Sequence, residues 1–193
     1  MDLNTSRNAA TSPDNALAPH RHLPEFYASQ EQRPEFVMRL FDNTARYYDR
    51  ISGVLSFGSC KAYRKMALRR AGLVPGMCLL DVATGTGLAA GAALSLGLPP
   101  SDIVGLDPSI GMLRENQKLR PVNLVQARGE NLPFADNSFD FISMGYALRH
   151  VEDLGVLFRE FRRVLKPGGR ILIMEISRRA ASGPPSSSSH AVL

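Results

Sequence analysis

The chain has 193 residues, of which 44% are hydrophobic and 21% are charged, and it contains no Trp. This hydrophobic fraction excludes a chain that is disordered throughout. The two cysteines, Cys60 and Cys78, are too few for a disulfide scaffold, lack the spacing of metal ligands and indicate a reducing compartment. Lys and Arg number 23 against 18 Asp and Glu, so the net charge of +5 is modest, and the length suits one domain.

The two ends of the chain have the composition of unfolded segments. Residues 1–33 are polar and rich in Asn, Ser and Pro, and residues 179–193 contain a run of four serines. We therefore expect a disordered leader, a folded domain over residues 34–178 and a flexible tail. No uncharged stretch is long enough to span a membrane and no apolar signal core follows Met1, which favours a cytoplasmic location.

The basic residues concentrate in one part of the domain. Residues 39–70 hold eight Lys or Arg and only two Asp, with apolar residues between them at helical spacing. We interpret residues 34–74 as a helical cap made of two or three amphipathic helices. Their charges can be ordinary solvated helix faces, or they can face an anionic ligand or an acidic membrane surface.

From residue 75 onward, short apolar runs alternate with helix-like segments. The predicted helices cover residues 88–96, 110–119 and 154–165, and the predicted strands cover residues 78–83, 103–106, 122–127, 139–144 and 170–176. Ser109 is the expected N-cap of the second of these helices. The alternation predicts an α/β core over residues 75–178, with a parallel sheet that binds ligands at the carboxyl ends of its strands.

A glycine-containing turn, Asp81-Val-Ala-Thr-Gly-Thr-Gly87, connects the first predicted strand to the next helix. Gly85 and Gly87 allow a tight turn and a close approach of the backbone to a ligand. An ordinary strand-to-helix turn is the simplest alternative. Asp107 ends the second strand, 20 residues after Gly87, where a carboxylate can accept both ribose hydroxyls of an adenosine.

NAD and S-adenosylmethionine both contain an adenosine, and Asp81 distinguishes between them. A dinucleotide would place its pyrophosphate at this turn, where a carboxylate repels it. S-adenosylmethionine has no phosphate and carries a cationic ammonium and a cationic sulfonium, which a carboxylate attracts. The residues therefore favour S-adenosyl-L-methionine as the cofactor, with an NAD-dependent oxidoreductase as the alternative.

Four segments, in this order, resemble the motifs of class I S-adenosylmethionine-dependent methyltransferases. They are LDVATGTG (80–87), GLDPSIGML (105–113), ENLPFADNSFD (130–140) and RVLKPGGR (163–170). Within that class, LFDNTARYYD (40–49) and ALRHV (147–151) are similar to the C-methyltransferases of ubiquinone and menaquinone biosynthesis. The resemblance covers about residues 36–177 and implies a Rossmann-like sheet in the order 3-2-1-4-5 with an N-terminal helical cap.

The resemblance also implies a set of cofactor-binding residues at the strand ends and in the cap. They are Tyr48, Asp81, Gly85, Thr86, Gly87, Asp107, Pro108, Arg128, Gly129 and Gly145. Asp81 would face the methionine amine and Asp107 would bind the ribose. Pro108 would pack by the adenine, Gly145 would face the sulfonium, and Tyr48 would approach the cofactor from the cap.

Three further residues are candidates for the methyl-transfer step. For a quinol-type acceptor, ionising a ring hydroxyl makes the ring carbon nucleophilic, and Arg149 can stabilise that phenolate directly or through water. His150 or Asp49 can take the proton. A partly exposed histidine without a catalytic role is the alternative for His150. The sequence shows no metal-binding pattern.

The C-terminal part departs from the expected pattern of the class, whose members usually continue with a helix and two more strands. We expect a C-terminally truncated domain in which the fifth strand is an unprotected apolar edge over residues 171–176. Such an edge can pair with a second copy or a partner, and the chain can be a non-catalytic cofactor-binding or partner subunit. We expect residues 1–193 to turn over more slowly than a longer form. The expected acceptor is a small molecule or lipid, with peripheral membrane contact, and not a nucleic acid.

Overall fold

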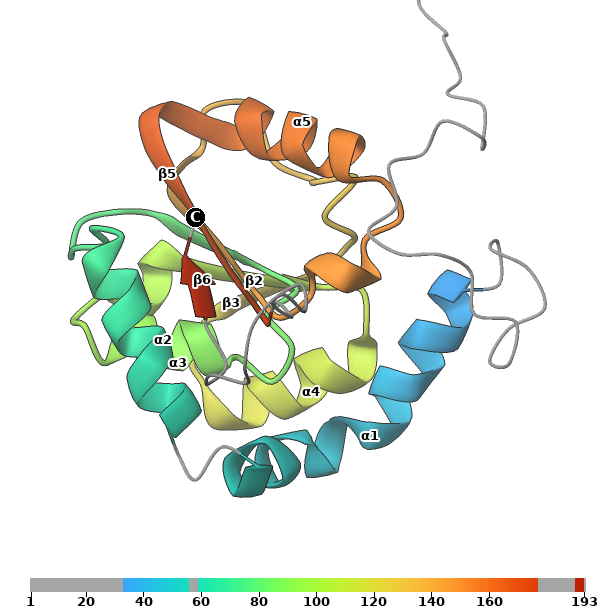
Figure 1. The fold of residues 1–193 in the computed structure, drawn as a ribbon. Helices are drawn as coiled ribbons and strands as arrows, with labels where there is room; N and C mark the ends of the chain where they lie inside the picture. The colour runs from blue at the N-terminus through green and yellow to red at the C-terminus, as the bar shows by residue number, and fades with distance from the viewer. Residues whose placement is uncertain (1–32, 56–58, 177–189, 193) are drawn as a thin grey trace, which may run out of the picture.

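The computed structural model describes residues 33–55, 59–176 and 190–192 (Figure 1). The predicted leader therefore lies outside the described residues except for Arg33, and so does most of the predicted tail. Side chains of residues 48–55 are also outside the description. Within the described ranges, no helix is both long enough and apolar enough to cross a membrane.

Two helices precede the sheet, as the apolar spacing of residues 39–70 predicted. Helix α1 (Arg33–Leu55) packs against α4 (Ile110–Leu119), and α2 (Ser59–Arg70) packs against α3 (Leu88–Leu94). Each helix buries one side, as the spacing of its apolar residues requires. In α2 that buried side consists of Arg64, Ala67 and Leu68.

Six strands form one sheet in the order β3-β2-β1-β4-β5-β6. They are β1 (Leu79–Val82), β2 (Ile103–Asp107), β3 (Asn123–Gln126), β4 (Phe139–Gly145), β5 (Leu165–Ile176) and β6 (His190–Val192). Strands β1 to β5 are parallel to their neighbours, which confirms the predicted α/β sheet and its order 3-2-1-4-5. The order reverses at β1, and sheets of this kind bind ligands at the carboxyl ends of the strands beside such a reversal.

The strands send alternate side chains to two separate cores. Leu79 and Phe141 belong to the core beneath α2 and α3, whereas Leu80 and Ile142 belong to the core beneath α5 (Leu154–Val164). Figure 1 shows the two layers, with α5 on one side of the sheet and α1 to α4 on the other. The same alternation puts Asp81 on the side of the sheet that α2 and α3 cover.

Two expectations about the C-terminal strands are wrong. Strand β5 begins at Leu165, before the predicted start at residue 170, and its pairing with β4 shifts register between Phe139 and Phe141. The irregular stretch contains Pro167, which cannot donate to a ladder, and Gly168 at φ 79°. In addition, β6 pairs antiparallel with the last three residues of β5, so the sheet has a sixth strand and this edge is covered there.

Helix α5 largely follows the predicted apolar stripe. Leu157, Phe161 and Val164 are buried, and Asp153 caps the helix by accepting from the backbone N–H groups of its first turn. Phe158 is 40% exposed, however, because it lies at the margin of the stripe.

One short 3-10 helix carries residues of the candidate site. The 3-10 helix η4 (Leu148–His150) follows β4 and carries two of the candidate catalytic residues. A further 3-10 helix, η3 (Pro100–Asp102), leads into β2.

Candidate functional site

The turn after β1 has a backbone that depends on its glycines. Gly85 and Gly87 have φ values of 56° and 84°, in the left-handed region that glycine adopts without strain. A Cβ on Gly87 would lie 2.3 Å from Oδ1 of Asn116, so this position has no room for a side chain. A Cβ on Gly85 would meet only Met112 Sδ, at 4.0 Å, which leaves open space in front of the turn.

Asp81 lies at the end of β1 with 1% of its surface exposed. Its carboxylate accepts hydrogen bonds from the hydroxyls of Thr84 and Ser143, each at 2.7 Å. Burial raises the pKa of Asp81, while these hydrogen bonds and the positive charge of Arg64 act in the opposite direction. The structure therefore holds a carboxylate at the predicted position, fixed by neighbours on β4 and in the glycine turn.

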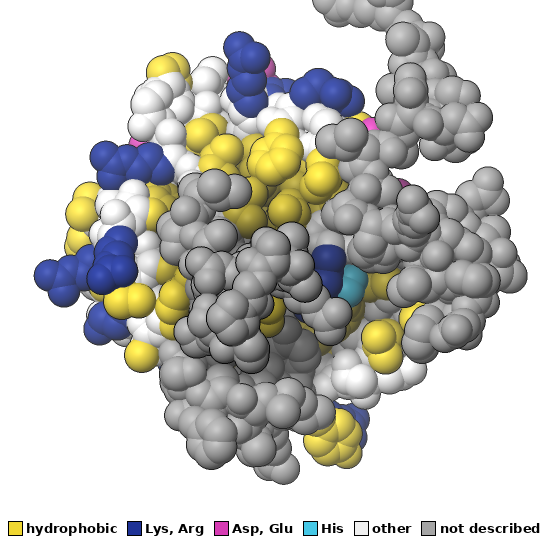
Figure 2. All heavy atoms as spheres, viewed as in Figure 1, with side chains coloured by type: hydrophobic (Ala, Val, Ile, Leu, Met, Phe, Trp, Pro, Cys, Tyr) yellow, Lys and Arg dark blue, Asp and Glu magenta, His cyan; other side chains and the backbone are white. Residues whose placement is uncertain are grey.

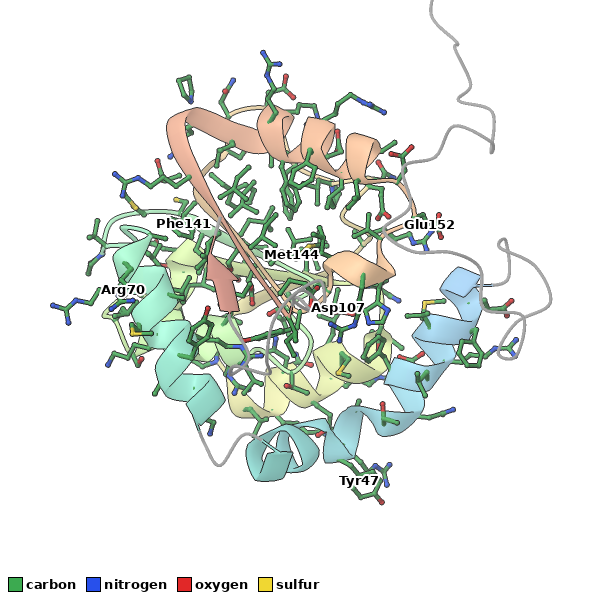
Figure 3. The ribbon with its side chains drawn as sticks, viewed as in Figure 1. Tyr47, Arg70, Asp107, Phe141, Met144 and Glu152 are labelled. Atoms are coloured by element: carbon green, nitrogen blue, oxygen red, sulfur yellow. The ribbon has the colours of Figure 1, made fainter. Side chains whose placement is uncertain are left out.

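Asp107 lies at the end of β2, near the middle of the molecule (Figure 3). Its two carboxylate oxygens accept from the backbone N–H of Gly85 at 2.8 Å and of Ser109 at 2.9 Å. Burial, with smaller contributions from the charges of Asp81 and Asp42, raises the pKa of Asp107 to about 6. One side chain thus joins the glycine turn to the start of α4.

Side chains at the end of helix α4 donate hydrogen bonds to the glycine turn. The amide of Asn116 is fully buried and donates to the carbonyl of Gly85 at 3.3 Å and to the hydroxyl of Thr84 at 3.4 Å. The guanidinium of Arg120 donates to the carbonyl of Thr86. Sequence reasoning missed both residues, because neither belongs to a recognisable motif and their contact with the turn depends on how α4 packs.

A second contact missed from the sequence joins α1 to the same region. Ser109 caps α4 as predicted, and its hydroxyl donates to Oδ1 of Asp42 at 2.5 Å. The same oxygen accepts from the N–H of Gly111 at 2.9 Å. Asp42 stands in the segment 40–49 that carried the family resemblance, which was the available signal.

The end of β4 lies beside the end of β1. Gly145 is the last residue of β4, and a Cβ there would meet only Met174 Cε, at 3.4 Å. The next residue, Tyr146, has φ 60°, an uncommon conformation for a residue with a side chain. Ala83, after β1, has φ 54°. Two of the three non-glycine residues with positive φ in the described ranges therefore lie at the ends of neighbouring strands, where strained backbone often marks function.

The candidate catalytic residues come from η4 and α1. Arg149 is exposed and forms an ion pair with Glu175 of β5 at 2.7 Å. The ring of His150 packs edge-on against Phe41 of α1, with 5.3 Å between ring centroids. Tyr48 and Asp49 lie on α1, but their side chains are outside the described part of the chain.

The predicted adenine-side residues differ in their surroundings. Arg128 is exposed and pairs with Glu152 at 2.5 Å, whereas Gly129 is buried. A Cβ on Gly129 would lie 2.6 Å from Leu157 Cδ1, so packing against α5 requires glycine there. Pro108 is half-buried, and its carbonyl accepts from Gln126 at 3.0 Å.

The arrangement can hold a cationic ligand that carries a ribose. Buried carboxylates end two neighbouring strands, and the glycines at positions 85 and 145 leave space beside them. No group of His, Cys, Asp or Glu within the described ranges has the geometry of a metal site.

Comparison with known proteins gives a consistent result. Residues 27–185 match the ubiE/COQ5 methyltransferase family. The demethylmenaquinone methyltransferase of Renibacterium salmoninarum is 39% identical over 151 residues, which cover 78% of this chain and 62% of the relative. The enzyme of the same name from Corynebacterium urealyticum is 42% identical over 150 residues, which cover 78% of this chain and 64% of the relative. The chain thus spans less than two thirds of the length of these relatives.

Solved structures support the same fold. A SAM-dependent methyltransferase from Thermotoga maritima superposes with a TM-score of 0.60 and 27% identity, covering 73% of this chain and 62% of that one. The [4+2]-cyclase SpnF gives a TM-score of 0.65 at 23% identity, covering 78% and 63%, and shows the fold alone. The Rossmann-like methyltransferase fold and the cofactor class predicted from the sequence are confirmed at the level of the family. The chain belongs to the ubiE/COQ5 methyltransferase family.

Proposed function

We propose that this chain binds S-adenosyl-L-methionine and transfers its methyl group to a ring carbon of a quinol-type acceptor. The observation that carries the proposal is the pair of buried carboxylates, Asp81 and Asp107, held at the ends of adjacent strands around a glycine turn. Such a site suits a cationic, phosphate-free ligand with a ribose. The names of the demethylmenaquinone methyltransferase relatives support the choice of acceptor.

The residues present fit this cofactor. Each oxygen of Asp81 accepts one side-chain hydrogen bond and keeps capacity for the methionine ammonium. Each oxygen of Asp107 likewise accepts one backbone bond and keeps capacity for a ribose hydroxyl. The backbone of Gly85, Thr86 and Gly87 lines the middle of the ligand.

The remaining contacts are proposed for the two ends of the ligand. Pro108, Arg128 and Gly129 flank the adenine, whereas Gly145 and Tyr48 lie by the sulfonium. When bound, S-adenosylmethionine supplies a methyl group already activated for in-line displacement. What the chain adds is orientation of the acceptor and exclusion of water.

The bonds that form and break in methyl transfer determine the roles of the residues beside the acceptor. A bond forms between the methyl and the ring carbon, the sulfur keeps the electron pair of the broken bond, and the ring carbon loses its proton. Arg149 stabilises the phenolate form of the acceptor, so that the phenolate takes the place that Glu175 occupies beside the guanidinium. His150 or Asp49 accepts the hydroxyl proton when the phenolate forms, and the oxygen is protonated again as the methylated ring carbon loses its proton, so that one proton is released overall.

We also propose that the chain is cytoplasmic and contacts the membrane through α2. The exposed side of α2 carries Lys61, Lys65, Arg69 and Arg70 around Met66, which is 41% exposed, and the helix contains no acidic residue. Figure 2 shows Lys and Arg side chains gathered over α2. A basic face with an apolar residue at its centre favours an anionic lipid surface, where a lipid quinol would be found.

Calorimetry with S-adenosylhomocysteine and with NADH tests the cofactor, and a methyl-transfer assay with a short-chain demethylmenaquinol tests the acceptor. We expect binding of S-adenosylhomocysteine, no binding of NADH, and a monomethylated quinol. Binding of NADH alone would overturn the proposal. Flotation with vesicles of phosphatidylglycerol and of phosphatidylcholine tests the membrane contact, which we expect only with the anionic lipid and only while the four basic residues of α2 are present.

The alternative is a non-catalytic cofactor-binding or partner subunit. Binding of S-adenosylhomocysteine without turnover of any quinol would support it. Light scattering after gel filtration tests whether a second copy pairs along the part of β5 that β6 does not cover.

A further inference from the structure

Asp42 belongs to the helical cap and not to the strand ends that carry the proposed cofactor residues. Its Oδ1 accepts from the hydroxyl of Ser109 at 2.5 Å and from the backbone N–H of Gly111 at 2.9 Å. Both donors stand at the start of α4, so a carboxylate of α1 holds the first turn of another helix. Figure 1 shows α1 running alongside α4, which brings these two segments together.

The backbones of these two helices approach closely at Gly111. A Cβ on Gly111 would lie 2.9 Å from Cα of Asp42 and 3.0 Å from its carbonyl oxygen. Both atoms belong to the backbone and cannot rotate away, as the end of a side chain could. Ala45, one turn further along α1, is buried. The contact between α1 and α4 is therefore close, and it requires glycine at position 111.

Ser109 lies between Asp42 and the carboxylate that we propose for the ribose. Its hydroxyl donates to Asp42, and its backbone N–H donates to Oδ1 of Asp107 at 2.9 Å. The N–H groups at the start of a helix have no partner within the helix, and both carboxylates accept from them. The two negative charges repel each other, and burial together with the charge of Asp42 raises the pKa of Asp107. The two carboxylates are therefore held close only while the donors at the start of α4 stay in place.

The residue before Asp42 contacts the acceptor side of the proposed site. The ring of Phe41 packs edge-on against His150 of η4, with 5.3 Å between ring centroids. Consecutive residues of α1 thus contact η4 on the acceptor side and the start of α4 on the donor side. Tyr48 and Asp49, the two cap residues proposed for the site, follow within about two turns of the same helix. The position of α1 therefore affects the groups proposed for both ligands.

We propose that Asp42 is a positioning residue, which couples binding of the cofactor to the docking of α1 on α4. The inference rests on the proposed function and deepens it, because it names the residue that joins the donor side to the acceptor side. While α1 is docked, Ser109 is fixed and its N–H aligns Asp107 for the ribose. When α1 separates from α4, Ser109 and Gly111 lose their partner and that alignment is lost. A ligand that binds the docked arrangement more tightly stabilises it, and this coupling is reciprocal.

Hydrogen exchange followed by mass spectrometry tests this coupling without any need for turnover. The amides of α1 exchange when the helix opens locally, and a ligand that favours the docked form slows that exchange. We expect saturating S-adenosylhomocysteine to slow exchange over residues 36–47 of the wild type about 5-fold or more, as for other coupled sites. In Asp42→Ala, saturation with the same ligand should slow it less than about 2-fold. Loss of a residue that served stability alone would speed exchange equally with and without the ligand, which leaves this ratio unchanged.

Three further variants separate the hydrogen bonds of Asp42 from general stability. Asp42→Asn keeps an oxygen that can accept from both donors and should retain the slowing. Gly111→Ala keeps Asp42 and raises the helix propensity of α4, but its Cβ displaces α1, so the slowing should be lost. Asp140→Ala is the matched control, because that carboxylate accepts from the N–H of Cys78 and from Lys166 near the start of β4, away from the site. It should lower stability and keep the full slowing.

Two results would overturn the inference while the cofactor site stands. One is a wild type that binds S-adenosylhomocysteine in calorimetry without slower exchange in α1. The other is a folded Asp42→Ala variant that keeps the full slowing, which would mean that the ligand reaches α1 by another contact. If Asp42→Ala does not fold, Gly111→Ala decides in the same way. A wild type that does not bind S-adenosylhomocysteine at all would instead refute the proposed function, and the inference with it.

Discussion

The donor side and the acceptor side of the proposed site are built differently. At the ends of β1 and β2, Asp81 and Asp107 are buried and their carboxylates accept hydrogen bonds from within the fold. Beyond β4, Arg149 is exposed and forms an ion pair with Glu175, and His150 packs on a ring of α1. The first side is rigid and internally satisfied, whereas the second is open and depends on contacts between separate elements.

This difference fits the two ligands that the proposed reaction needs. The donor is one invariant molecule, so a preorganised site can match it through buried hydrogen bonds. The acceptor must enter, react and leave, and an exposed ion pair costs little to rearrange because solvent screens it. Substitutions on the first side should therefore change stability and binding together, whereas those on the second should change turnover alone.

The largest expected effect is that of Gly87→Ala. A Cβ at this position would lie 2.3 Å from Asn116 while the backbone holds φ 84°, so overpacking adds to backbone strain. Together these cost about 4 kcal/mol of unfolding free energy. Urea denaturation measures this loss, and calorimetry should show no binding of S-adenosylhomocysteine.

Gly76→Ala is the matched control for that variant. Gly76 has φ 92°, but nothing lies within 4 Å of the added Cβ, so only the backbone strain remains. We expect a loss of about 1 kcal/mol and unchanged binding. Equal losses for the two variants would show that the contact between Asn116 and the turn is not tight.

The sequence predicted the site residues near strand ends, but not those whose contacts depend on how separate elements pack. Gly85, Asp81 and Asp107 could be placed in advance, because each stands within a few residues of a strand end and the local pattern fixes where a strand end points. Asn116, Arg64 and Asp42 could not, since their contacts with Gly85, Tyr146 and Ser109, respectively, arise only when segments far apart in the sequence pack together.

The fold shows the same limit. Alternation of apolar runs predicted the five parallel strands and the resemblance to the methyltransferase class implied their order, whereas β6 was missed. Three residues after a Ser/Pro/Gly-rich stretch carry too short a pattern to predict a strand, and their pairing with the end of β5 is a tertiary contact. The early start of β5 was missed because Lys-Pro-Gly-Gly is typical of a turn.

The second prediction concerns the titration of Asp107. A pKa raised from 3.8 to about 6 means that the folded state binds this proton more tightly than the unfolded chain does. The carboxyl therefore contributes full stability below about pH 4, and the contribution is lost as pH rises through 6, about 3 kcal/mol in all.

Comparison with Asp107→Asn isolates this effect, because Asp140 and Glu160, whose pKa values are lowered by Lys166 and Arg163, give the opposite pH dependence in both proteins. The quantity to follow is the unfolding free energy of the wild type minus that of the variant. This difference should fall by about 3 kcal/mol between pH 4 and pH 7. A difference that does not change with pH would show that the carboxyl is hydrated rather than buried.

The smallest effect on stability is expected on the acceptor side, for Glu175→Gln and Arg149→Met. The Arg149 side chain is 48% exposed, so the ion pair contributes less than about 0.5 kcal/mol and neither variant should change unfolding or the binding of S-adenosylhomocysteine appreciably. Turnover should separate them. Loss of Glu175 removes the carboxylate that competes with the phenolate for the guanidinium and should leave kcat unchanged or higher, whereas loss of Arg149 should lower kcat about 100-fold, the size of one oxyanion contact. Equal losses of kcat in the two variants would mean that the intact pair, rather than the arginine alone, takes part in the reaction.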